Sequence, residues 1–426
     1  MQTEAQNERL LDRGFIMNVL FLSLNDFNSF EDRTIYSDLL QAFIKAGHTV
    51  CCISPVERRT QLETKLLRFG KNRILRLKIG NIQKVNLIEK GISTLSIEPL
   101  FIRAIKTYFS DIKFDLVLYA TPPITFANVV KYIKKRDGAQ SYLMLKDIFP
   151  QNSVDLGMLS KTGIKGLIYK YFRAKEKKLY ALSDHIGCMS PANCSYLLKH
   201  NPEIDPAIVE VCPNSIDVQD LSLTDVERRE MREKYGVPLD KKVFVYGGNL
   251  GRPQDVPFIV RCLKACADLK NVYFVIAGSG TDRHILEQFV QKETPQHVKL
   301  MGHLPKDEYD RMIACCDVGL IFLDHRFTIP NFPSRLLSYM QAGLPVLACT
   351  DPNTDVGQVI EEGGFGWWCE SNDPNAVANI ISSIAVEDII LKGEQAKNFL
   401  KENYDVTIAY NTIKQVLENK TPTKGR

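Results

Sequence analysis

The sequence predicts an α/β protein built from two doubly wound domains, each with a parallel sheet. Short apolar runs rich in β-branched residues alternate with segments of helical length and a period near 3.6, and this series occurs twice. The strand-like runs are apolar throughout, as expected for parallel strands covered on both faces. The chain has 426 residues, 45% of them hydrophobic, which is enough for two or three separate cores.

The first domain is predicted over residues 17–214, after an N-terminal extension of residues 1–16. Its strand-like runs are residues 19–23, 49–53, 115–120, 141–146, 185–190 and 208–212. Turn-forming residues follow at Pro213, Asn214 and Ser215. This turn predicts the hinge between the two series.

The second domain is predicted over residues 215–404. Its strand-like runs are residues 243–247, 272–277, 298–301, 318–322, 345–350 and 366–369. Residues 400–418 have a helical pattern, and residues 419–426 form a polar tail. For residues 405–426 we expect a C-terminal helix that returns to the first domain, followed by this tail.

Composition and targeting signals restrict where the protein acts. No stretch approaches the roughly 18 apolar residues needed to span a bilayer. Residues 1–14 are polar and charged, so no secretory leader is predicted. The 11 cysteines include no C-x-x-C pair and are expected to be reduced and buried. We therefore expect a cytoplasmic protein.

Charge is divided unevenly between the two halves. Residues 1–220 hold 30 Lys and Arg against 23 Asp and Glu, a net of +7, whereas the remainder holds 24 against 27, a net of −3. The acidic second half, and basic residues without interleaved aromatic platforms, argue against a nucleic-acid partner. The division indicates separate tasks for the two halves.

One basic segment predicts contact with a membrane surface. Residues 58–84 hold nine basic residues against Glu63, with leucines and isoleucines interleaved. A partly helical, amphipathic segment of this kind suits an anionic inner membrane face, through Arg68, Lys71, Arg73 and Arg76. The alternative is a solvated face whose leucines pack on the first sheet.

Glycine-containing turns follow three strand-like runs of the second half. They contain Gly247, Gly248 and Gly251, then Gly278 and Gly280, then Gly302. Glycine after a parallel strand lets the backbone approach a ligand closely and directs amide N–H groups at phosphate. One such turn is more often only a sharp connection, but three in one domain favour a nucleotide crevice.

A second signal is the segment of residues 331–345. Pro333 or Ser334 opens a predicted helix, and Gly343 closes it. Arg335 lies in its first turn, where a guanidinium can bind two phosphate oxygens at once. The alternative is a helix whose arginine only faces solvent.

These motifs together resemble the retaining family-four glycosyltransferases of the GT-B fold. The resemblance is greatest to the fucosamine-transferase and colanic-acid type, which builds bacterial cell-surface polysaccharides. In the second half it rests on residues 277–280, 300–304, 316–320, 333–335, 339–340, 342–346 and 361–366. In the first half it rests on residues 121–123, 146–150 and 183–190. The order and spacing of these motifs are more specific than any one of them.

The resemblance implies two Rossmann-like domains that face each other across a cleft. The second domain would bind a nucleotide-sugar, UDP- or GDP-linked, and the first would present the acceptor, a polyprenyl-linked glycan. It implies donor contacts at Gly248, Asn249, Gly251, Arg252, Gly278, Ser279, Gly302, His303, Leu304, Asn331, Ser334, Arg335 and Ser338. Arg335 would also act in catalysis.

Asp147 is the acceptor-side carboxylate nearest the implied cleft, and it could orient or deprotonate the acceptor hydroxyl. A structural cap or salt bridge is the alternative. No Asp-x-Asp occurs, and no cluster of His, Cys and carboxylates has ligand spacing. We therefore expect no metal and no cofactor, so that cations and helix N-termini stabilise the departing diphosphate.

Two departures from the family pattern leave alternatives open. The family commonly carries two glutamates eight positions apart, where this chain has Pro330 and Ser338. The usual Arg and Lys of the first glycine turn are Asn249 and Gln254. Beside a glycosyltransferase, we therefore keep a nucleotide-sugar epimerase or hydrolase of this fold, and a non-catalytic assembly partner.

Overall fold

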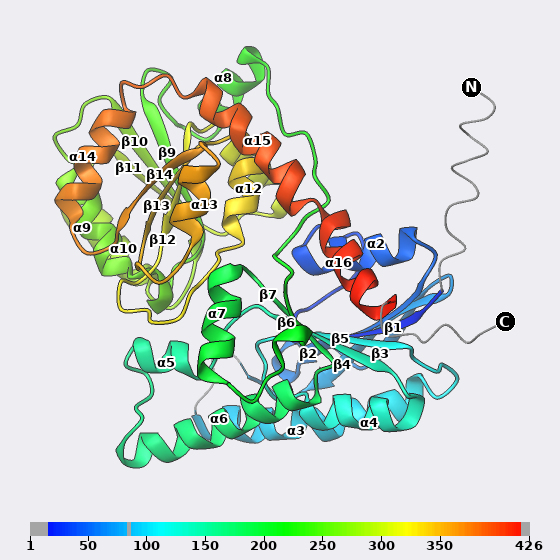
Figure 1. Ribbon diagram of the computed structural model, residues 1–426. Helices are drawn as coiled ribbons and strands as arrows, with labels where there is room; N and C mark the ends of the chain where they lie inside the picture. The colour runs from blue at the N-terminus through cyan, green and yellow to red at the C-terminus, as the bar shows by residue number, and fades with distance from the viewer. Residues whose placement is uncertain (1–15, 83–86, 419–426) are drawn as a thin grey trace, which may run out of the picture.

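The computed structural model describes residues 16–82 and 87–418, which form two sheet domains joined at one side (Figure 1). The N-terminal extension, except for Ile16, Lys84 of the basic segment and the polar tail lie outside the described residues. The first domain has an eight-stranded sheet and the second a six-stranded one. Each predicted strand-like run overlaps a strand of one of these sheets.

The first sheet is parallel except for β3 at its edge. In spatial order its strands are β3 (Lys65–Phe69), β4 (Asn72–Ile79), β2 (Thr49–Glu57), β1 (Asn18–Leu22), β5 (Leu116–Ala120), β6 (Gln140–Leu145), β7 (His185–Cys188) and β8 (Val209–Val211). Its helices are α2 (Ile35–Lys45), α3 (Leu87–Tyr108), α4 (Ala127–Asp137), α5 (Gln151–Asp155), α6 (Gly163–Leu182) and α7 (Pro191–His200). Short 3₁₀ turns occur at Arg58–Thr60 and Pro206–Ile208.

Strand β1 shows why the predicted runs are continuously apolar. Leu20 and Leu22 pack in the core beneath α3, α4 and α6. Val19 and Phe21 point to the opposite face and pack in the core beneath α2 and the C-terminal helix α16 (Val406–Glu418). Because residues 19–22 alternate between two covered faces, none of them is polar.

The second sheet is parallel throughout. In spatial order its strands are β11 (Val298–Met301), β10 (Val272–Ser279), β9 (Lys242–Asn249), β12 (Val318–Phe322), β13 (Val346–Thr350) and β14 (Gly366–Glu370). Its helices are α8 (Asp225–Lys234), α9 (Val256–Ala265), α10 (Arg283–Glu293), α11 (Lys306–Ala314), α12 (Arg335–Gln341), α13 (Val356–Glu362), α14 (Pro374–Ile384) and α15 (Ile390–Tyr404). A 3₁₀ turn lies at Arg252–Gln254.

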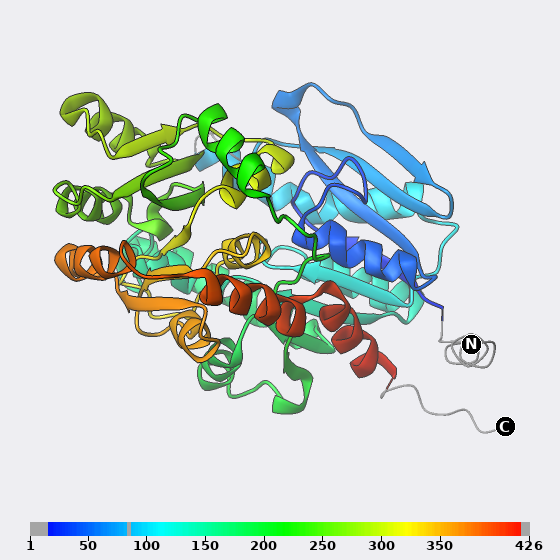
Figure 2. The same cartoon turned by 90° about the horizontal axis from the view of Figure 1, so that it is seen from above.

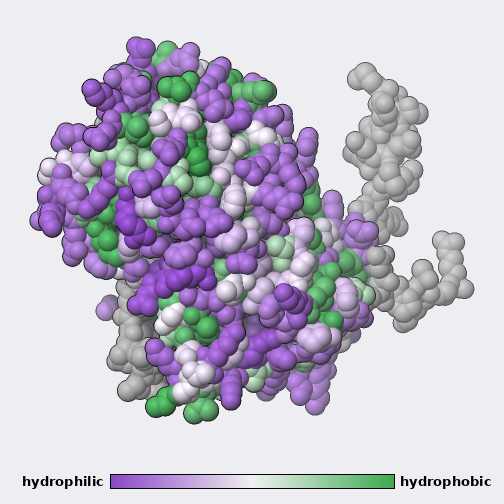
Figure 3. All heavy atoms as spheres, turned by 60° about the vertical axis from the view of Figure 1, so that its left-hand side comes forward, coloured by the Kyte–Doolittle hydropathy of each residue, from purple (hydrophilic) through white to green (hydrophobic). Residues whose placement is uncertain are grey.

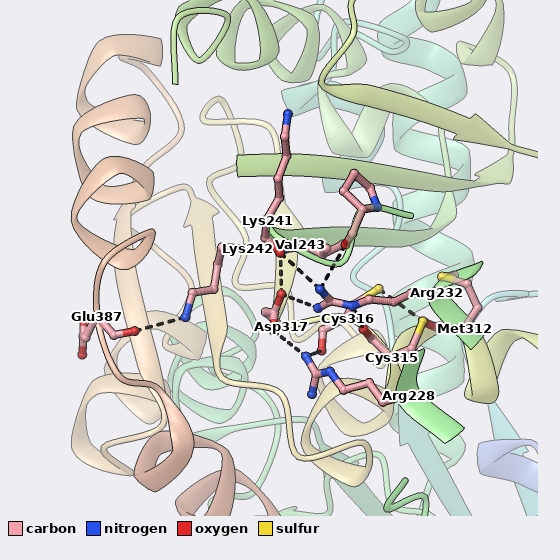
Figure 4. A network of polar contacts seen from close by, with 11 residues as sticks. Arg228, Arg232, Lys241, Lys242, Val243, Met312, Cys315, Cys316, Asp317 and Glu387 are labelled. Atoms are coloured by element: carbon pink, nitrogen blue, oxygen red, sulfur yellow. Dashed lines mark hydrogen bonds and ion pairs between the residues drawn. The ribbon is translucent and has the colours of Figure 1, made fainter. Parts of the chain in front are cut away.

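An ion-pair network fixes α8 to the second sheet (Figure 4). Asp317, just before β12, receives Arg232 Nη2 at 2.7 Å and the backbone N–H of Val243 at 2.6 Å. Arg228 pairs with the other oxygen of the same carboxylate. Arg232 is buried, so the pairing offsets the desolvation of its charge. The network lies at the amino ends of β9 and β12 and leaves their carboxyl ends free for a site.

The chain crosses between the domains twice at one place. Ile216 and Asp405 form an isolated parallel bridge, in which the N–H of Ile216 donates to Tyr404 and that of Val406 donates to Ile216. Beyond Asp405, α16 packs on α2 of the first domain, as seen from above in Figure 2. The helical pattern predicted for residues 400–418 is therefore interrupted at Asp405, where ψ is 141°.

A small apolar cluster joins the domains on the other side of the interface. Ile148 and Leu156 of the first domain pack against Leu323, Phe327 and Ile329 of the second. Beside this cluster Asp155, at the end of α5, accepts hydrogen bonds from the backbone and hydroxyl of Thr328. The two domains thus touch on both sides of the space between them.

The described part of the basic segment, residues 58–82, forms no α-helix, in contrast to the prediction. It forms the 3₁₀ turn and the antiparallel hairpin of β3 and β4 at the sheet edge. Arg73 pairs with Asp111 at 2.6 Å, Arg76 with Asp26 at 2.8 Å, and Lys71 donates to the carbonyl of Gly47. Alternation of basic and apolar residues fits a half-buried strand as well as a helix, and acids distant in sequence stabilise the strand.

Candidate functional site

A cavity of about 750 Å³ lies between the domains at the carboxyl ends of β9, β10 and β11. Parallel sheets of this type bind ligands at this edge because the strand-to-helix turns gather there. From the second domain the cavity is lined by Gly247, Gly248, Asn249, Ala277, Gly278, Ser279, Gly302, His303, Leu304, Lys306, Tyr309, Ser334, Arg335, Leu337, Ser338 and Gln341. From the first domain and the crossing segment it is lined by Arg33, Thr34, Ile35, Asp38, Ile216 and Asp217.

The first two glycine turns touch each other. Gly248 and Gly278 are partners across β9 and β10, with φ values of 122° and 153°. A Cβ on Gly278 would lie 1.9 Å from the carbonyl oxygen of Gly248, which is far inside van der Waals contact. Only glycine at position 278 lets the two turns approach and form the floor of the cavity.

Arg335 enters the cavity from the first turn of α12. Its guanidinium stacks on the ring of Tyr246, 4.4 Å from the centroid. A Cβ on Gly248 would lie 3.6 Å from the guanidinium carbon, so the cation faces the first glycine turn. Within the described part of the chain, the buried Nη1 has no hydrogen-bond acceptor. The guanidinium is permanently charged, so this N–H group lacks an anionic hydrogen-bond partner.

Helix α12 is positioned by Tyr339 rather than by its cap. The Tyr339 hydroxyl donates to the carbonyl of Leu320 at 3.1 Å and accepts from the N–H of Gly247 at 3.0 Å. The helix begins within one residue of the predicted start, but Ser334 makes no side-chain cap bond and the helix has only seven residues. Anion binding therefore depends on the Arg335 side chain more than on the helix dipole.

The third turn is fixed to the second by Arg283, which sequence analysis did not single out. Its Nη1 donates to the carbonyl of Gly278 at 2.5 Å and to that of Met301 at 2.6 Å. Gly302, His303 and Leu304 follow directly and line the cavity. An arginine inside an ordinary amphipathic helix carries no signal in the sequence, so only the fold reveals this role.

The first-domain wall is one segment at the start of α2, and it too was missed. Arg33 has a φ of 50° and reaches across the interface to Asp307 at 2.9 Å and Asp310 at 3.0 Å. Asp38, one turn into α2, accepts the N–H of Asp217 at 3.0 Å, and burial raises the pKa of its carboxyl. These partners are remote in sequence, so no local pattern connects them.

Four predicted site residues lie outside the cavity lining. Gly251 is buried, and its N–H donates to the Gln254 side chain, while Arg252 is exposed on the 3₁₀ turn. Asn331 precedes α12, and its carbonyl accepts from Thr354. Of the cations predicted to grip a diphosphate, only Arg335 lines the cavity.

Asp147 is the fourth of these residues. It follows β6, is partly buried, and both carboxylate oxygens accept from Asn152 Nδ2 at 2.9 Å. Burial raises the pKa of Asp147 to about 6, which the hydrogen bonds from Asn152 partly oppose. Burial, and to a smaller extent the charge of Asp147, raises the pKa of Tyr36, next to the cavity residue Ile35. Asp147 thus acts electrostatically on the start of α2 without lining the cavity.

The described residues bring one possible metal-ligand group together, Asp255 with Asp324 and His325. It lies outside the cavity lining. Arg326 already occupies Asp324, through Nε at 2.9 Å and Nη2 at 2.5 Å. An arginine held between these oxygens competes with a cation, so we assign no metal to this group.

Known proteins resemble this chain in both sequence and fold. Residues 227–420 match the family described as glycosyl transferases group 1. The second half of the chain is therefore similar to the group 1 glycosyltransferases. This match covers the three glycine turns and Arg335 and extends through α16, so it includes the whole second-domain wall of the cavity.

Two curated relatives and one solved structure extend the comparison. A probable glycosyltransferase, WbjE of Pseudomonas aeruginosa, is 25% identical over 86% of this chain and 86% of its own. WcaI of Escherichia coli K12, a putative colanic acid biosynthesis glycosyl transferase, is 21% identical over 63% and 65%. The structure of Anabaena HepE in complex with UDP-glucose superposes with a TM-score of 0.69 at 15% identity, over 95% of this chain and 100% of HepE. The fold is GT-B, as predicted.

Proposed function

We propose that this protein transfers a sugar from a nucleotide diphosphate to a glycan acceptor, with retention of anomeric configuration and without a metal ion. The observation that carries the proposal is the Arg335 guanidinium, which is stacked on Tyr246 and whose buried Nη1 has no acceptor among the described residues. An oxygen of a bound diphosphate would supply the missing hydrogen-bond acceptor for Nη1. Because charge develops on the leaving phosphate oxygen, a preorganised cation lowers the barrier to its departure.

The donor would lie against the second-domain wall. Gly248 and Asn249 approach a phosphate closely from the first turn, while Ser334 and Ser338 offer hydroxyls on the α12 side. Gly302, His303 and Leu304 border the base through backbone groups. HepE, which has this fold, was solved with UDP-glucose. UDP- and GDP-sugars are the donors that we propose to test first.

The acceptor would enter from the first-domain side. WbjE and WcaI are named as glycosyltransferases, and WcaI is named for colanic acid biosynthesis. The name of WcaI supports a role in polysaccharide synthesis, and we propose the cell surface as its destination and a polyprenyl-linked glycan as the acceptor. No helix of the described residues is long and apolar enough to cross a membrane. We propose that the protein works from the cytoplasmic face as a peripheral membrane protein.

A non-catalytic assembly partner is the second candidate. Pro330 and Ser338 stand where the family commonly has glutamates, and Pro330 uses its carbonyl to accept from Asn193 across the interface. A scaffold would not need the unpartnered cation of Arg335. The two candidates therefore differ in whether a nucleotide binds.

Mass-spectrometric screening of UDP-, GDP- and other nucleotide-sugars with polyprenyl-diphosphate-sugar acceptors tests the proposal. We expect an elongated acceptor with one donor, and its loss in Arg335→Ala. Free sugar without an elongated acceptor would instead indicate a hydrolase, and an isomerised donor would indicate an epimerase. Nucleotide binding without turnover of any donor, or no binding at all, would contradict the transferase.

A further inference from the structure

Helix α6 begins with an apolar stripe that nothing in the structure covers. Ile164, Leu167 and Ile168 are 82%, 68% and 44% exposed, and Tyr171 continues the line. Positions separated by three, four and seven residues share one face of a helix, so these side chains form a single strip. Met158, in the turn before α6, is exposed as well. This α6 stripe, residues 164, 167, 168 and 171, lies on the outside of the first domain.

The stripe lies in a basic surface. Helix α6 carries six basic residues and one acid, Glu176. Glu176 is buried and accepts from Arg173 at 2.6 Å and from Tyr180 at 2.6 Å, so its charge does not reach the surface. Lys161, Lys165 and Lys170 are exposed beside the stripe. Exposed apolar residues flanked by lysines are the pattern of a helix that lies in an anionic membrane interface.

A second exposed apolar patch provides the contrast. Val386, Ile390 and Leu391 of the second domain are 80%, 70% and 65% exposed. Residues 383–397 hold three acids against Lys392 and Lys397, a net of −1, so this patch lacks the excess of lysines found around the α6 stripe. An anionic surface would not attract it. Charge therefore distinguishes two patches of similar apolar exposure, and only the α6 stripe is complementary to anionic lipid.

The α6 stripe also has a suitable position. Helix α5 contacts the second domain through Asp155 and leads directly into the turn before α6 (Figure 1). The start of α6 lies below α5, at the end of the first domain that faces away from the second domain in Figure 1. Figure 3 shows hydrophobic side chains exposed at this lower end. A membrane here would lie beside the domain that is proposed to present the acceptor.

We propose that the α6 stripe inserts into the interface of an anionic phospholipid bilayer, with Lys161, Lys165 and Lys170 at the headgroups. This surface replaces the β3–β4 hairpin as the expected membrane contact, since Arg73 and Arg76 of that hairpin are held in ion pairs. Its purpose rests on the proposed lipid-linked acceptor. The binding itself requires no substrate, so a failure here and a failure of the proposed function are distinguishable.

Co-sedimentation of the full chain with vesicles of phosphatidylglycerol and phosphatidylethanolamine, without substrates, tests the proposal. We expect binding that falls about tenfold or more when Ile164, Leu167 and Ile168 are changed together to Gln. Val386, Ile390 and Leu391 changed to Gln form the matched control and should bind like the wild type. Lys161, Lys165 and Lys170 changed to Gln should weaken binding and remove most of its salt dependence.

We expect each variant to fold, because the altered side chains are exposed. Circular dichroism checks this. Equal binding by the α6 variant and the matched control would overturn the proposal, as would equal partition onto vesicles of phosphatidylcholine alone. Loss of binding in Arg68→Gln/Lys71→Gln, with the α6 variant unaffected, would assign the contact to the hairpin instead. A dimer in light scattering that the α6 variant converts to a monomer, without a change in lipid binding, would assign the stripe to a second copy.

Discussion

The two walls of the interdomain cavity differ in how they are built. The second-domain wall consists of three strand-to-helix turns, of which the first two touch through their backbones, together with one cation held by stacking on Tyr246. The first-domain wall is one segment at the start of α2, held across the interface by the ion pairs of Arg33. A backbone floor cannot adjust to an added atom, whereas the ion pairs of a partly exposed arginine such as Arg33 are weaker and can break. The comparison indicates a rigid donor side and an adjustable acceptor side.

The largest expected effect is that of Gly278→Ala, since the new Cβ would meet the carbonyl of Gly248 at 1.9 Å. Strain at a φ of 153° and the backbone overlap together should lower the free energy of unfolding by about 2 to 5 kcal/mol. Gly302→Ala is the matched control, because nothing lies within 4 Å of its added Cβ. Urea denaturation measures both. Equal effects of the two substitutions would mean that the floor is not rigid.

Arg335→Ala should reduce turnover by about 30- to 150-fold, because a charge-assisted and desolvated contact is worth about 2 to 3 kcal/mol. Arg335→Lys should restore only part of the loss, since lysine lacks the planar fork. Arg252→Ala is the control, an exposed cation on the same side that lies outside the cavity lining. Comparable losses in the Arg252 and Arg335 variants would contradict the assignment of the diphosphate to Arg335.

Asp147→Asn tests the role of the Asp147 carboxyl, which follows β6. Folding raises the pKa of Asp147 from 3.8 to about 6, so the folded protein favours the protonated acid and loses stability as the pH rises through 6. The variant should therefore be more stable than the wild type by about 1 to 2 kcal/mol at pH 7.5, and this difference should shrink toward pH 4. Thermal unfolding at both pH values measures it.

The same residue gives a kinetic test. If ionised Asp147 orients the acceptor hydroxyl, kcat/KM of the wild type should fall below a pH of about 6. The Asn variant should lack this acid limb and be slow at all pH values. A variant that is more stable and fully active would leave Asp147 with a structural role only.

The smallest effect is expected for Arg33→Ala on the adjustable wall. Asp310 keeps Lys306 as a partner, and Asp307 is largely exposed. The free energy of unfolding should therefore fall by only about 0.5 to 1 kcal/mol. We expect KM for the acceptor to rise about two- to fivefold with little change in stability. Asp307→Ala should have a still smaller effect. A loss as large as that of Arg335→Ala would mean that Arg33 itself grips the donor.

The same difference explains what could be predicted from the sequence. The strands and the three glycine turns were predictable because each is a local pattern imposed by covered faces and close backbone approach. Arg33, Asp38 and Arg283 were not, since their roles depend on partners distant in the sequence. The sequence predicts a partly helical, amphipathic segment where β3 and β4 form a hairpin, because the acids that pair with Arg73 and Arg76 lie elsewhere in the chain.

Arg252 shows the limit of motif transfer. It follows the first glycine turn, but the 3₁₀ turn at Arg252–Gln254 directs it to solvent, and Gln254 bonds to Gly251 and Asn249 instead of a ligand. A change of few residues in a loop moves a side chain from a cavity to the surface. Motif order identified the domain, while the loop geometry decided which cation faces the site.

We propose that the cavity binds a nucleoside diphosphate through Arg335. Titration calorimetry with UDP and GDP measures this binding. Wild-type protein should bind one of them saturably, Arg335→Ala should bind it about 30- to 150-fold more weakly, and Arg252→Ala should match the wild type. Folded wild-type protein that binds neither nucleotide, or an Arg335→Ala variant with unchanged affinity, would contradict the account.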